Sequence, residues 1–380
     1  MRYINIETEE EKRALENLEK RDNAESIRLK RLLSLPDLSR TEGSPLKEIV
    51  DRTLQVKGLD GFDIIKIPEI VSVEILFDLF NMPLGHPSRS KSDTYYVDEK
   101  HVLRTHDTVF WYYYLSDPEI RQKIAKKESF GAICFGKVYR KDEIDRTHMN
   151  VFHQMGGLLL SPDEKPVTSE DLKTILSDIA RAIFGEKVEF RFYEHNFPYT
   201  DPSFEMEAFI NGKWVEMLGS GLPRKSVLQN FGLEGYNGWA FGFGLERLAM
   251  ASMDLPDIRL LWSEDERVRE QLKLGQKFEE VSKYPPVLRD ISFVVSNDLV
   301  INDYFDLIRD VGGEIIEAVE LKDKYENKEK FGEGKTSYTF GITYRSLERT
   351  LTNAEVNNVH SEVESRTKNE LGAVLREAGT

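Results

Sequence analysis

The residues best suited to chemistry lie between two apolar stretches, 131–140 and 151–160. The first stretch is rich in β-branched and aromatic residues, the second is largely apolar, and each predicts a strand. The loop between them carries both signs of charge and is longer than the Gly/Asn turn of a simple hairpin. Arg140 comes where the first strand ends, and a guanidinium there suits phosphate because it stays charged and donates two parallel hydrogen bonds. On spacing alone, an edge hairpin with a solvated tip is the simpler interpretation.

Two carboxylates form a second candidate site in the stretch 203–220. Asn211-Gly212 between two alternating runs is typical of a two-residue hairpin turn, and counting back from it pairs Glu207 with Glu216. Opposed carboxylates repel each other unless a cation lies between them. Magnesium carried by a triphosphate fits, since it takes one or two carboxylates plus phosphate oxygens. A solvated pair is the alternative.

The string from Tyr139 to Gln154, YRKDEIDRTHMNVFHQ, resembles motif 2 of the phenylalanyl-tRNA synthetases, a family of class II aminoacyl-tRNA synthetases. The single-chain, organellar type is the most similar. Gly238–Met250, GWAFGFGLERLAM, matches motif 3 of the same class, and helix, strand and proline over residues 46–68 are similar to motif 1. The resemblance extends from about Gly61 to the C-terminus.

This resemblance implies a site for ATP beside a site for phenylalanine. Arg140 would hold the α-phosphate and the substrate carboxylate, Arg247 the γ-phosphate, and Glu207 with Glu216 a Mg²⁺ ion. The implied ATP-binding residues are Arg140, Thr147, His148, Met149, Phe152, Glu216, Phe241 and Arg247, with the rings of Phe152 and Phe241 stacked on adenine. The implied amino-acid-binding residues are His106, Asp107, Thr108, Trp111, Gln154, Gly156, Phe197, Tyr199 and Ala240. Phe197 and Tyr199 would sandwich the substrate ring, and Ala240 would form the pocket floor.

The amino-acid site departs from the family pattern at several positions. The family has Thr-Ser where this chain has Asp107-Thr108, a Gln where it has Trp111, and a Glu where it has Gly156. A buried ammonium needs a carboxylate or several acceptors around it. Asp107 is therefore a candidate replacement for the missing Glu. Alternatively, Asp107 caps the turn that follows it, and the sequence favours neither interpretation.

The composition of the chain limits the classes of protein to which it can belong. With 380 residues, 40% of them hydrophobic, the chain is long enough for two domains. A net charge of −15 argues against loose, charge-driven binding of nucleic acid, so RNA would contact local basic patches. The single cysteine, Cys134, excludes a disulfide framework. No apolar run is long enough to cross a membrane, and the acidic start is unlike a transit peptide, so we expect a cytoplasmic protein without membrane contact.

Four regions are predicted along the chain: a charged helical extension (1–40), a catalytic domain (41–270), a charged linker (271–282) and a C-terminal domain (283–380). The extension is expected to be one helix over residues 8–33. The last region has the order strand (287–295), helix (302–311), strand (314–322), strand (336–345), helix (353–369) and strand (371–376). That βαββαβ order predicts a ferredoxin-like fold. It resembles the anticodon-binding domain of the family, and the basic residues that we expect to contact tRNA are Lys322, Lys324, Arg345 and Arg349.

The expected fold is thus α+β: a class II antiparallel sheet flanked by helices, followed by a ferredoxin-like domain. The resemblance implies that the chain activates L-phenylalanine with ATP and transfers it to tRNA(Phe). Thr108, Trp111 and Gly156 motivate two alternatives: a synthetase with another amino-acid specificity, and a paralogue that binds RNA or an amino acid without catalysis. The single-chain relatives imply a monomer, with a homodimer as the alternative.

Overall fold

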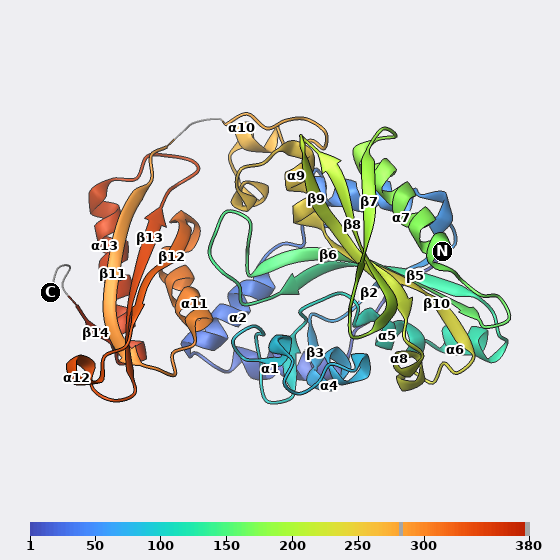
Figure 1. The fold of residues 1–380 in the computed structure, drawn as a ribbon, viewed down its shortest axis with the longest axis horizontal. Coiled ribbons are helices and arrows are strands. Elements are labelled where there is room, and N and C mark those ends of the chain that lie inside the picture. The colour runs from blue at the N-terminus through green and yellow to red at the C-terminus, as the bar shows by residue number, and fades with distance from the viewer. Residues whose placement is uncertain (281–283, 377–380) are drawn as a thin grey trace. The chain divides into compact units, whose positions relative to one another are not determined.

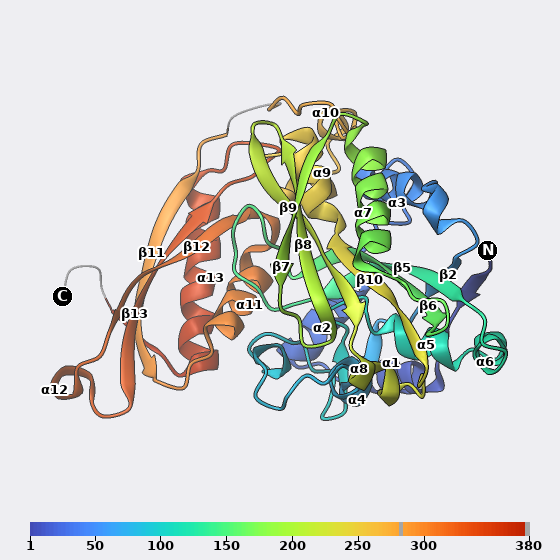
Figure 2. The same ribbon diagram turned by 45° about the vertical axis from the view of Figure 1, so that its right-hand side comes forward.

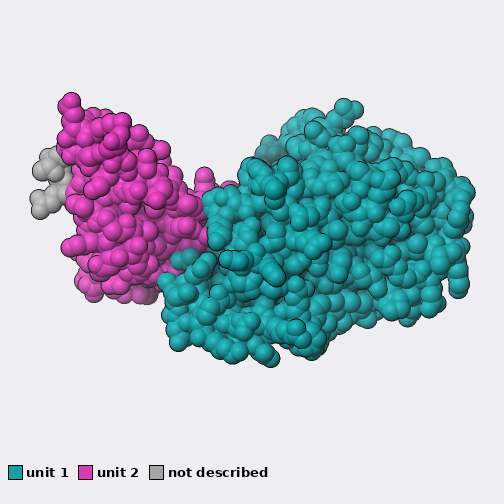
Figure 3. All heavy atoms as spheres, turned by 90° about the horizontal axis from the view of Figure 1, so that it is seen from below, with its two compact units in different colours: residues 1–140, 151–255, 272–278 teal, residues 141–150, 256–271, 279–380 magenta. Residues whose placement is uncertain are grey.

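The computed structural model describes residues 1–280 and 284–376 (Figure 1). The chain forms two compact units, coloured separately in Figure 3. Unit 1 contains residues 1–140, 151–255 and 272–278, and unit 2 contains residues 141–150, 256–271 and 279–380. Of the predicted linker and C-terminal domain, residues 281–283 and 377–380 lie outside the described residues.

An eight-stranded sheet forms the centre of unit 1, in the order β1-β2-β5-β6-β10-β9-β8-β7. Its strands are β1 (Tyr3–Asn5), β2 (Asp63–Lys66), β5 (Phe130–Tyr139), β6 (Val151–Pro162), β7 (Glu189–His195), β8 (Thr200–Ile210), β9 (Lys213–Pro223) and β10 (Tyr236–Gly244). All pairings from β5 to β7 are antiparallel, which confirms the predicted fold class. The sheet is nevertheless mixed, because β1, β2 and β5 pair in parallel.

Helices cover both faces of this sheet. On one face α3, α7 and α9 contact one another or the strands below them, and Figure 2 shows α3 beside α7. The helices of unit 1 are α1 (Glu9–Glu19), α2 (Ala24–Ser34), α3 (Pro45–Leu54), α4 (Val73–Leu76), α5 (Phe110–Ser116), α6 (Pro118–Ala125), α7 (Ser169–Phe184), α8 (Lys225–Asn230) and α9 (Leu245–Met253). Strands β3 (Ile70–Ser72) and β4 (His101–Leu103) form a separate pair. Throughout the described ranges, no helix combines the length and apolar character needed to cross a membrane.

The N-terminal region differs from the single solvated helix that we predicted over residues 8–33. It forms two helices, because Asn23 caps a new start at α2 with its side chain. Both helices contribute buried residues to unit 1. The carboxylate of Glu11 accepts hydrogen bonds from the backbone of Glu69 and Ile70 (2.7 and 3.1 Å). The region is therefore packed into unit 1 and does not form a free arm.

Unit 2 contains the predicted βαββαβ module. Its four-stranded antiparallel sheet has the order β12-β13-β11-β14. The elements are β11 (Val287–Ser296), α11 (Ile301–Gly312), β12 (Ile316–Tyr325), α12 (Lys328–Phe331), β13 (Lys335–Tyr344), α13 (Asn353–Leu371) and β14 (Val374–Leu375), preceded by α10 (Glu266–Arg269). Thr352 and Glu355 form the expected capping box of α13. The ferredoxin-like fold is confirmed.

The loop 141–150, which joins β5 to β6, belongs to unit 2 and not to the sheet whose strands it connects. Ile144 is buried in the apolar core of the ferredoxin-like module, and its carbonyl accepts a hydrogen bond from Val319 (3.1 Å). Arg146 forms an ion pair with the buried Glu317 (2.5 Å). The prediction of one continuous catalytic domain over residues 41–270 did not anticipate this arrangement.

Candidate functional site

The site begins on one face of β6. His153 and Met155 are fully buried on the other face, whereas Phe152 and Gln154 are partly exposed, as the alternation of a strand requires. Gly156 lies opposite Gly242 of β10, so the same face continues from β6 onto β10. Of the predicted site residues, Phe152, Gln154 and Gly156 of β6 lie on this face.

Arg140 follows the last residue of β5 and is held over this face. Its Nε donates a hydrogen bond to the carbonyl of Thr105 (2.9 Å), and its guanidinium carbon lies 5.1 Å from the ring centroid of Phe152. The guanidinium is exposed at the strand end, as expected of a group that receives phosphate. Its role in binding ATP stays a prediction.

The hairpin register agrees with the prediction, since Glu207 lies opposite Glu216. An arginine contacts each carboxylate: Arg191 is 2.7 Å from Glu207, and Arg247 is 2.7 Å from Glu216. The cations that relieve the repulsion between the carboxylates are therefore side chains of the protein. The Asn211-Gly212 turn sets this register, and a β-bulge between Met206 and Glu207 shifts the pairing only beyond the two carboxylates.

The two carboxylates differ in how well they suit Mg²⁺. The described residues contain no group of three or more side chains that could hold a metal ion by themselves. Magnesium needs only one or two carboxylates when phosphate oxygens supply other ligands. Glu216 is half exposed beside Arg247 and fits that role, whereas Oε2 of Glu207 accepts a hydrogen bond from Nε of Arg191 and forms an ion pair with Nη2 of the same side chain.

Phe241 does not reach the face that carries Phe152. Its ring stacks between those of Trp239 and Phe243, with centroids 5.8 and 5.9 Å away, and it is buried against Gly157. Because Gly157 and Gly156 face opposite sides of β6, Phe241 lies on the far side of the sheet. The prediction that Phe241 stacks on adenine is therefore wrong.

A buried pair that sequence reasoning missed connects β6 to α9. Glu246 is 3% exposed, and its carboxylate accepts hydrogen bonds from the backbone N–H of His153 (2.9 Å) and from its Nδ1 (2.7 Å). The other ring nitrogen of His153 accepts a hydrogen bond from the backbone of Leu38 (2.9 Å). Because Arg247 follows Glu246, this pair fixes the start of the helix that carries Arg247. The only sequence signal was a histidine and a glutamate in two of the recognised motifs.

Phe197 and Tyr199 stack on one another, with centroids 5.8 Å apart and planes 7° from parallel. No third ring fits between rings at this separation, so the predicted sandwich around the substrate ring is not formed. The pair instead makes one wall, and a Cβ at Gly219 would lie only 2.8 Å from the tip of the Phe197 ring. Burial raises the pKa of Tyr199 to about 12, and nearby Asp107 acts in the same direction.

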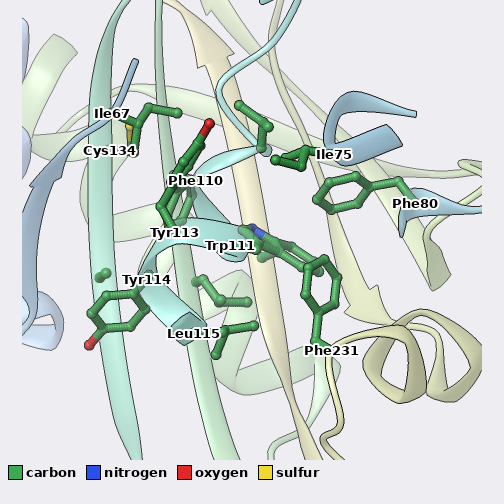
Figure 4. Close-up of a cluster of buried hydrophobic side chains, with 14 of the residues drawn as sticks. Ile67, Ile75, Phe80, Phe110, Trp111, Tyr113, Tyr114, Leu115, Cys134 and Phe231 are labelled. Carbon is green, nitrogen blue, oxygen red and sulfur yellow. The ribbon is translucent and has the colours of Figure 1, made fainter. Parts of the chain in front are cut away.

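Trp111 belongs to the apolar cluster beneath this wall (Figure 4). It is 1% exposed, and its ring packs against Phe80 and Phe231 at centroid distances of 5.4 and 6.3 Å. Phe80 in turn contacts Tyr199, so Trp111 lies one layer behind the wall. The prediction that Trp111 lines the amino-acid site is wrong for this reason. Ala240 is buried in the same cluster, and its role as the pocket floor stays a prediction.

Asp107 lies buried against Gly156, with 3% of the residue exposed. Its backbone N–H donates to Oε1 of Gln154 (3.1 Å), while Oδ2 has no hydrogen-bond partner among the described residues. Helix α5 begins after Val109 and has no side-chain cap, so Asp107 does not cap this helix, while the backbone N–H groups of Asp107 and Thr108 act on its carboxylate. Burial raises the pKa of Asp107 to about 7.

The two neighbours of Asp107 in sequence differ in environment. Burial, together with the positive charge of Arg140, lowers the pKa of His106 to about 3, so His106 is a neutral group in this site. Thr108 is partly exposed, and its carbonyl accepts a hydrogen bond from the backbone of Trp111 (3.0 Å). The roles of His106 and Thr108 in amino-acid binding stay predictions.

The remaining predicted residues belong to unit 2. In the loop 141–150, Nδ1 of His148 is 2.8 Å from the carboxylate of Asp145, and Thr147 donates to the same carboxylate; Met149 follows them. Of the four basic residues predicted to contact tRNA, Lys322 pairs with Asp290 (2.6 Å), Arg345 with Glu317 (2.6 Å) and Arg349 with Glu355 (2.8 Å), and Lys324 lies over the ring of Tyr338. Because Glu317 is buried, the ion pair with Arg345 neutralises a buried carboxylate inside the module. The part that all four residues play in RNA binding stays a prediction.

Comparisons with known proteins agree with this architecture. Residues 33–272 match the class II tRNA synthetase core domain (F), and residues 282–376 match the ferredoxin-fold anticodon-binding domain. The chain is 41% identical to the chloroplastic/mitochondrial phenylalanine–tRNA ligase of Arabidopsis thaliana over 319 residues, which cover 81% of this chain and 71% of the relative. It is 37% identical to the mitochondrial phenylalanine–tRNA ligase of Mus musculus (81% of this chain, 74% of the relative) and 32% identical to that of Saccharomyces cerevisiae (79% and 80%).

These relatives correct one expectation. We expected a cytoplasmic protein because the first residues are acidic and unlike a transit peptide. The similar proteins named above are mitochondrial or chloroplastic, which contradicts that expectation.

Proposed function

Because this chain belongs to the phenylalanine–tRNA ligase family of class II aminoacyl-tRNA synthetases, we propose that it activates L-phenylalanine with ATP and transfers it to tRNA(Phe). The observation that carries the proposal is the similarity over about four fifths of the chain, with both the core and the anticodon-binding domain present in order. In unit 1, Arg140, Phe152 and Gln154 lie on or over one face of the sheet, as this chemistry requires.

In the first step, an oxygen of the phenylalanine carboxylate attacks the α-phosphorus of ATP. A carboxylate oxygen–phosphorus bond forms, the bond from the α-phosphorus to the bridging oxygen breaks, and pyrophosphate leaves with the electron pair. The protein accelerates this step by alignment and by charge neutralisation. Arg140 faces the α-phosphate and carboxylate, Arg247 the γ-phosphate, Phe152 the adenine, and Gln154 the amino-acid end.

ATP is the nucleotide that class II synthetases use, and we propose that Mg²⁺ accompanies it. Glu216 would be the protein ligand, and the triphosphate would supply the other oxygens. The ion, when bound, neutralises charge on the phosphates. Arg247, which contacts Glu216, then turns one or more of its donors toward the γ-phosphate. Glu207 would act by holding Arg191.

In the second step, a hydroxyl of the terminal nucleotide of tRNA attacks the carbonyl carbon of the adenylate. An ester bond forms and the hydroxyl loses its proton, while the bond from the carbonyl carbon to the phosphate oxygen breaks and AMP leaves with the electron pair. The ferredoxin-like module provides the anticodon-binding part of this reaction. We further propose that the chain works as a monomer, which sedimentation equilibrium would test.

The deciding experiment is amino-acid-dependent ATP–pyrophosphate exchange with each of the standard amino acids. Exchange with phenylalanine alone supports the proposal. Exchange with another amino acid would support the altered specificity that Thr108, Trp111 and Gly156 suggest. If no amino acid supports exchange, the remaining alternative is a paralogue that binds RNA or an amino acid without catalysis. Arg181→Ala, which removes a partly exposed arginine of α7 together with its ion pair to Asp178, is a matched control for changes at Arg140.

A further inference from the structure

Within the described part of the chain, the buried carboxylate of Asp107 lacks a hydrogen-bond or ion-pair partner at one of its oxygens, and a bound ligand could supply that partner. One of its oxygens, Oδ2, is buried without a hydrogen-bond partner, and Asp107 forms no ion pair with any described residue. A buried polar atom without a partner costs free energy, and a buried charge costs more, so such groups mark places where a ligand binds. The inference that follows rests on the function proposed above.

Two glycines on neighbouring strands make the space that Asp107 fills. A Cβ at position 156 would overlap Oδ2 of Asp107 and lie 2.9 Å from its Cγ and 3.0 Å from the carbonyl oxygen of Phe241. A Cβ at Gly242 would lie 3.4 Å from Oδ1. Positions 107 and 156 therefore compete for one volume, and a side chain at 156 cannot coexist with the carboxylate of Asp107 in this arrangement.

The charges around Asp107 come from two arginines whose Nε atoms point to backbone carbonyls. Nε of Arg104 donates to Lys137 (2.8 Å), and Nε of Arg140 donates to Thr105 (2.9 Å). Both arginines favour the ionised form of Asp107, although burial acts more strongly against it. A cationic ligand group at Oδ2 would add the contact that the protein itself does not supply.

We propose that Asp107 binds the α-ammonium group of the amino-acid substrate, in place of a carboxylate projected from position 156. Gln154, whose Oε1 already accepts a hydrogen bond from the backbone of Asp107, lies beside the same group. Ala240 lies two residues from Gly242 along β10, a separation of about 7 Å. The side chain of phenylalanine spans that separation, which directs the ring from Asp107 toward the pocket floor.

The test compares two ligands that differ in the amine alone. L-Phenylalanine and 3-phenylpropionate are titrated by calorimetry, without ATP, into the wild-type chain and into Asp107→Asn. We expect the wild type to bind phenylalanine on the order of 100-fold more tightly than 3-phenylpropionate, because a buried ammonium gains a charged partner. In Asp107→Asn the two affinities should come within a few fold of each other. Asp178→Asn, on the exposed side of α7, is the matched control and should keep the wild-type ratio.

A purely structural aspartate would give a different result. In that case Asp107→Asn weakens both ligands equally and leaves their affinity ratio unchanged, which would overturn the inference. If the wild type supports no pyrophosphate exchange but its preference for the amine depends on Asp107, the proposed function fails while this inference stands. If the wild type supports exchange but its preference for the amine does not depend on Asp107, this inference fails while the proposed function stands.

A positional swap adds an independent measurement. Asp107→Thr alone should lose the preference for the amine, and Gly156→Glu alone should lower Tm through overlap with Asp107. The double variant removes the overlap and returns a carboxylate to the neighbouring strand, so it should recover the preference to within about tenfold of the wild type. A folded double variant that shows no recovery would mean that a carboxylate in this volume is not what binds the amine.

Discussion

The affinity for the amino acid should depend on pH through Asp107. Burial raises the pKa of Asp107 to about 7, against the opposing pull of Arg104 and Arg140. Cys134 and Tyr199 also lie near enough to feel its charge, and burial raises the pKa of each of them to about 12, so neither ionises near neutrality. His106 is neutral over the same range, because its pKa is about 3. Asp107 is therefore the group of this site that changes charge between pH 6 and 8.

The size of the effect follows from the fraction ionised. With a pKa of about 7, roughly nine tenths of Asp107 is ionised at pH 8 and about one tenth at pH 6. An ammonium binds the ionised form, and a proton competes with it. The affinity for L-phenylalanine should therefore fall about tenfold from pH 8 to pH 6, or ~1.4 kcal/mol.

Stability should move in the opposite direction. Because the folded-state pKa of Asp107 is raised, its contribution to stability is fully present below the ordinary pKa of an aspartate and is lost as pH rises toward 7. The ligand-free protein is thus destabilised by Asp107 over the same range in which its affinity for the amine grows. Phenylalanine should consequently raise Tm more at pH 8 than at pH 6.

The assay is calorimetric titration of phenylalanine at several pH values without ATP, since the phosphates of ATP titrate in this range. Asp107→Asn should show a flat profile over the same range. A wild-type affinity that does not change between pH 6 and 8 would refute the reasoning. The same conclusion follows if Asp107→Asn keeps the full pH dependence, because another group would then be responsible.

Three further predictions concern other parts of the site. Arg140→Ala should abolish pyrophosphate exchange with Tm nearly unchanged, since charge-assisted contacts formed in the transition state are lost; a wild-type rate would contradict the assignment. Glu246→Ala leaves two buried N–H groups of His153 without an acceptor and should lower the free energy of unfolding by about 2–5 kcal/mol, against about 1 kcal/mol for Glu246→Gln, as measured by urea denaturation. Deleting the chain from residue 281 should abolish charging of tRNA and, because Ile144 then loses its apolar partners, should also slow exchange. Charging at the full rate would refute the anticodon-binding role.

Local patterns were enough to predict strands β5 and β6, the β8–β9 hairpin and the element order of the last domain. The Asn211-Gly212 turn determined the opposition of Glu207 and Glu216, and capping residues together with hydrophobic periodicity gave the βαββαβ order of the last domain. These features depend on residues close in sequence, whose backbone preferences act without help from the rest of the fold.

The features that could not be predicted depend on contacts between distant segments. The motif around Phe241 did not reveal which face of the sheet its ring occupies, because that depends on the register with β6. The arginine partners of the two glutamates come from β7 and α9. The overlap between Asp107 and position 156 is likewise visible only once the two segments meet. The sequence showed that positions 107 and 156 both differ from the family pattern. It did not show that a side chain at position 156 would overlap the carboxylate of Asp107.

The loop 141–150 has a consequence for how such a protein can change over time. The chain passes between the two units at 140/141, 150/151, 255/256, 271/272 and 278/279, so the C-terminal module is not a separate segment appended after the last residue of the core. A recombination event near residue 280 would combine the C-terminal module of one protein with the loop 141–150 of another. Ile144 packs into the core of the module and Arg146 pairs with its Glu317, so both contacts would then join residues from two different proteins. Chimeras joined at that point should therefore work only when the loop is exchanged together with the module, and the two segments are expected to be inherited and to vary as a pair.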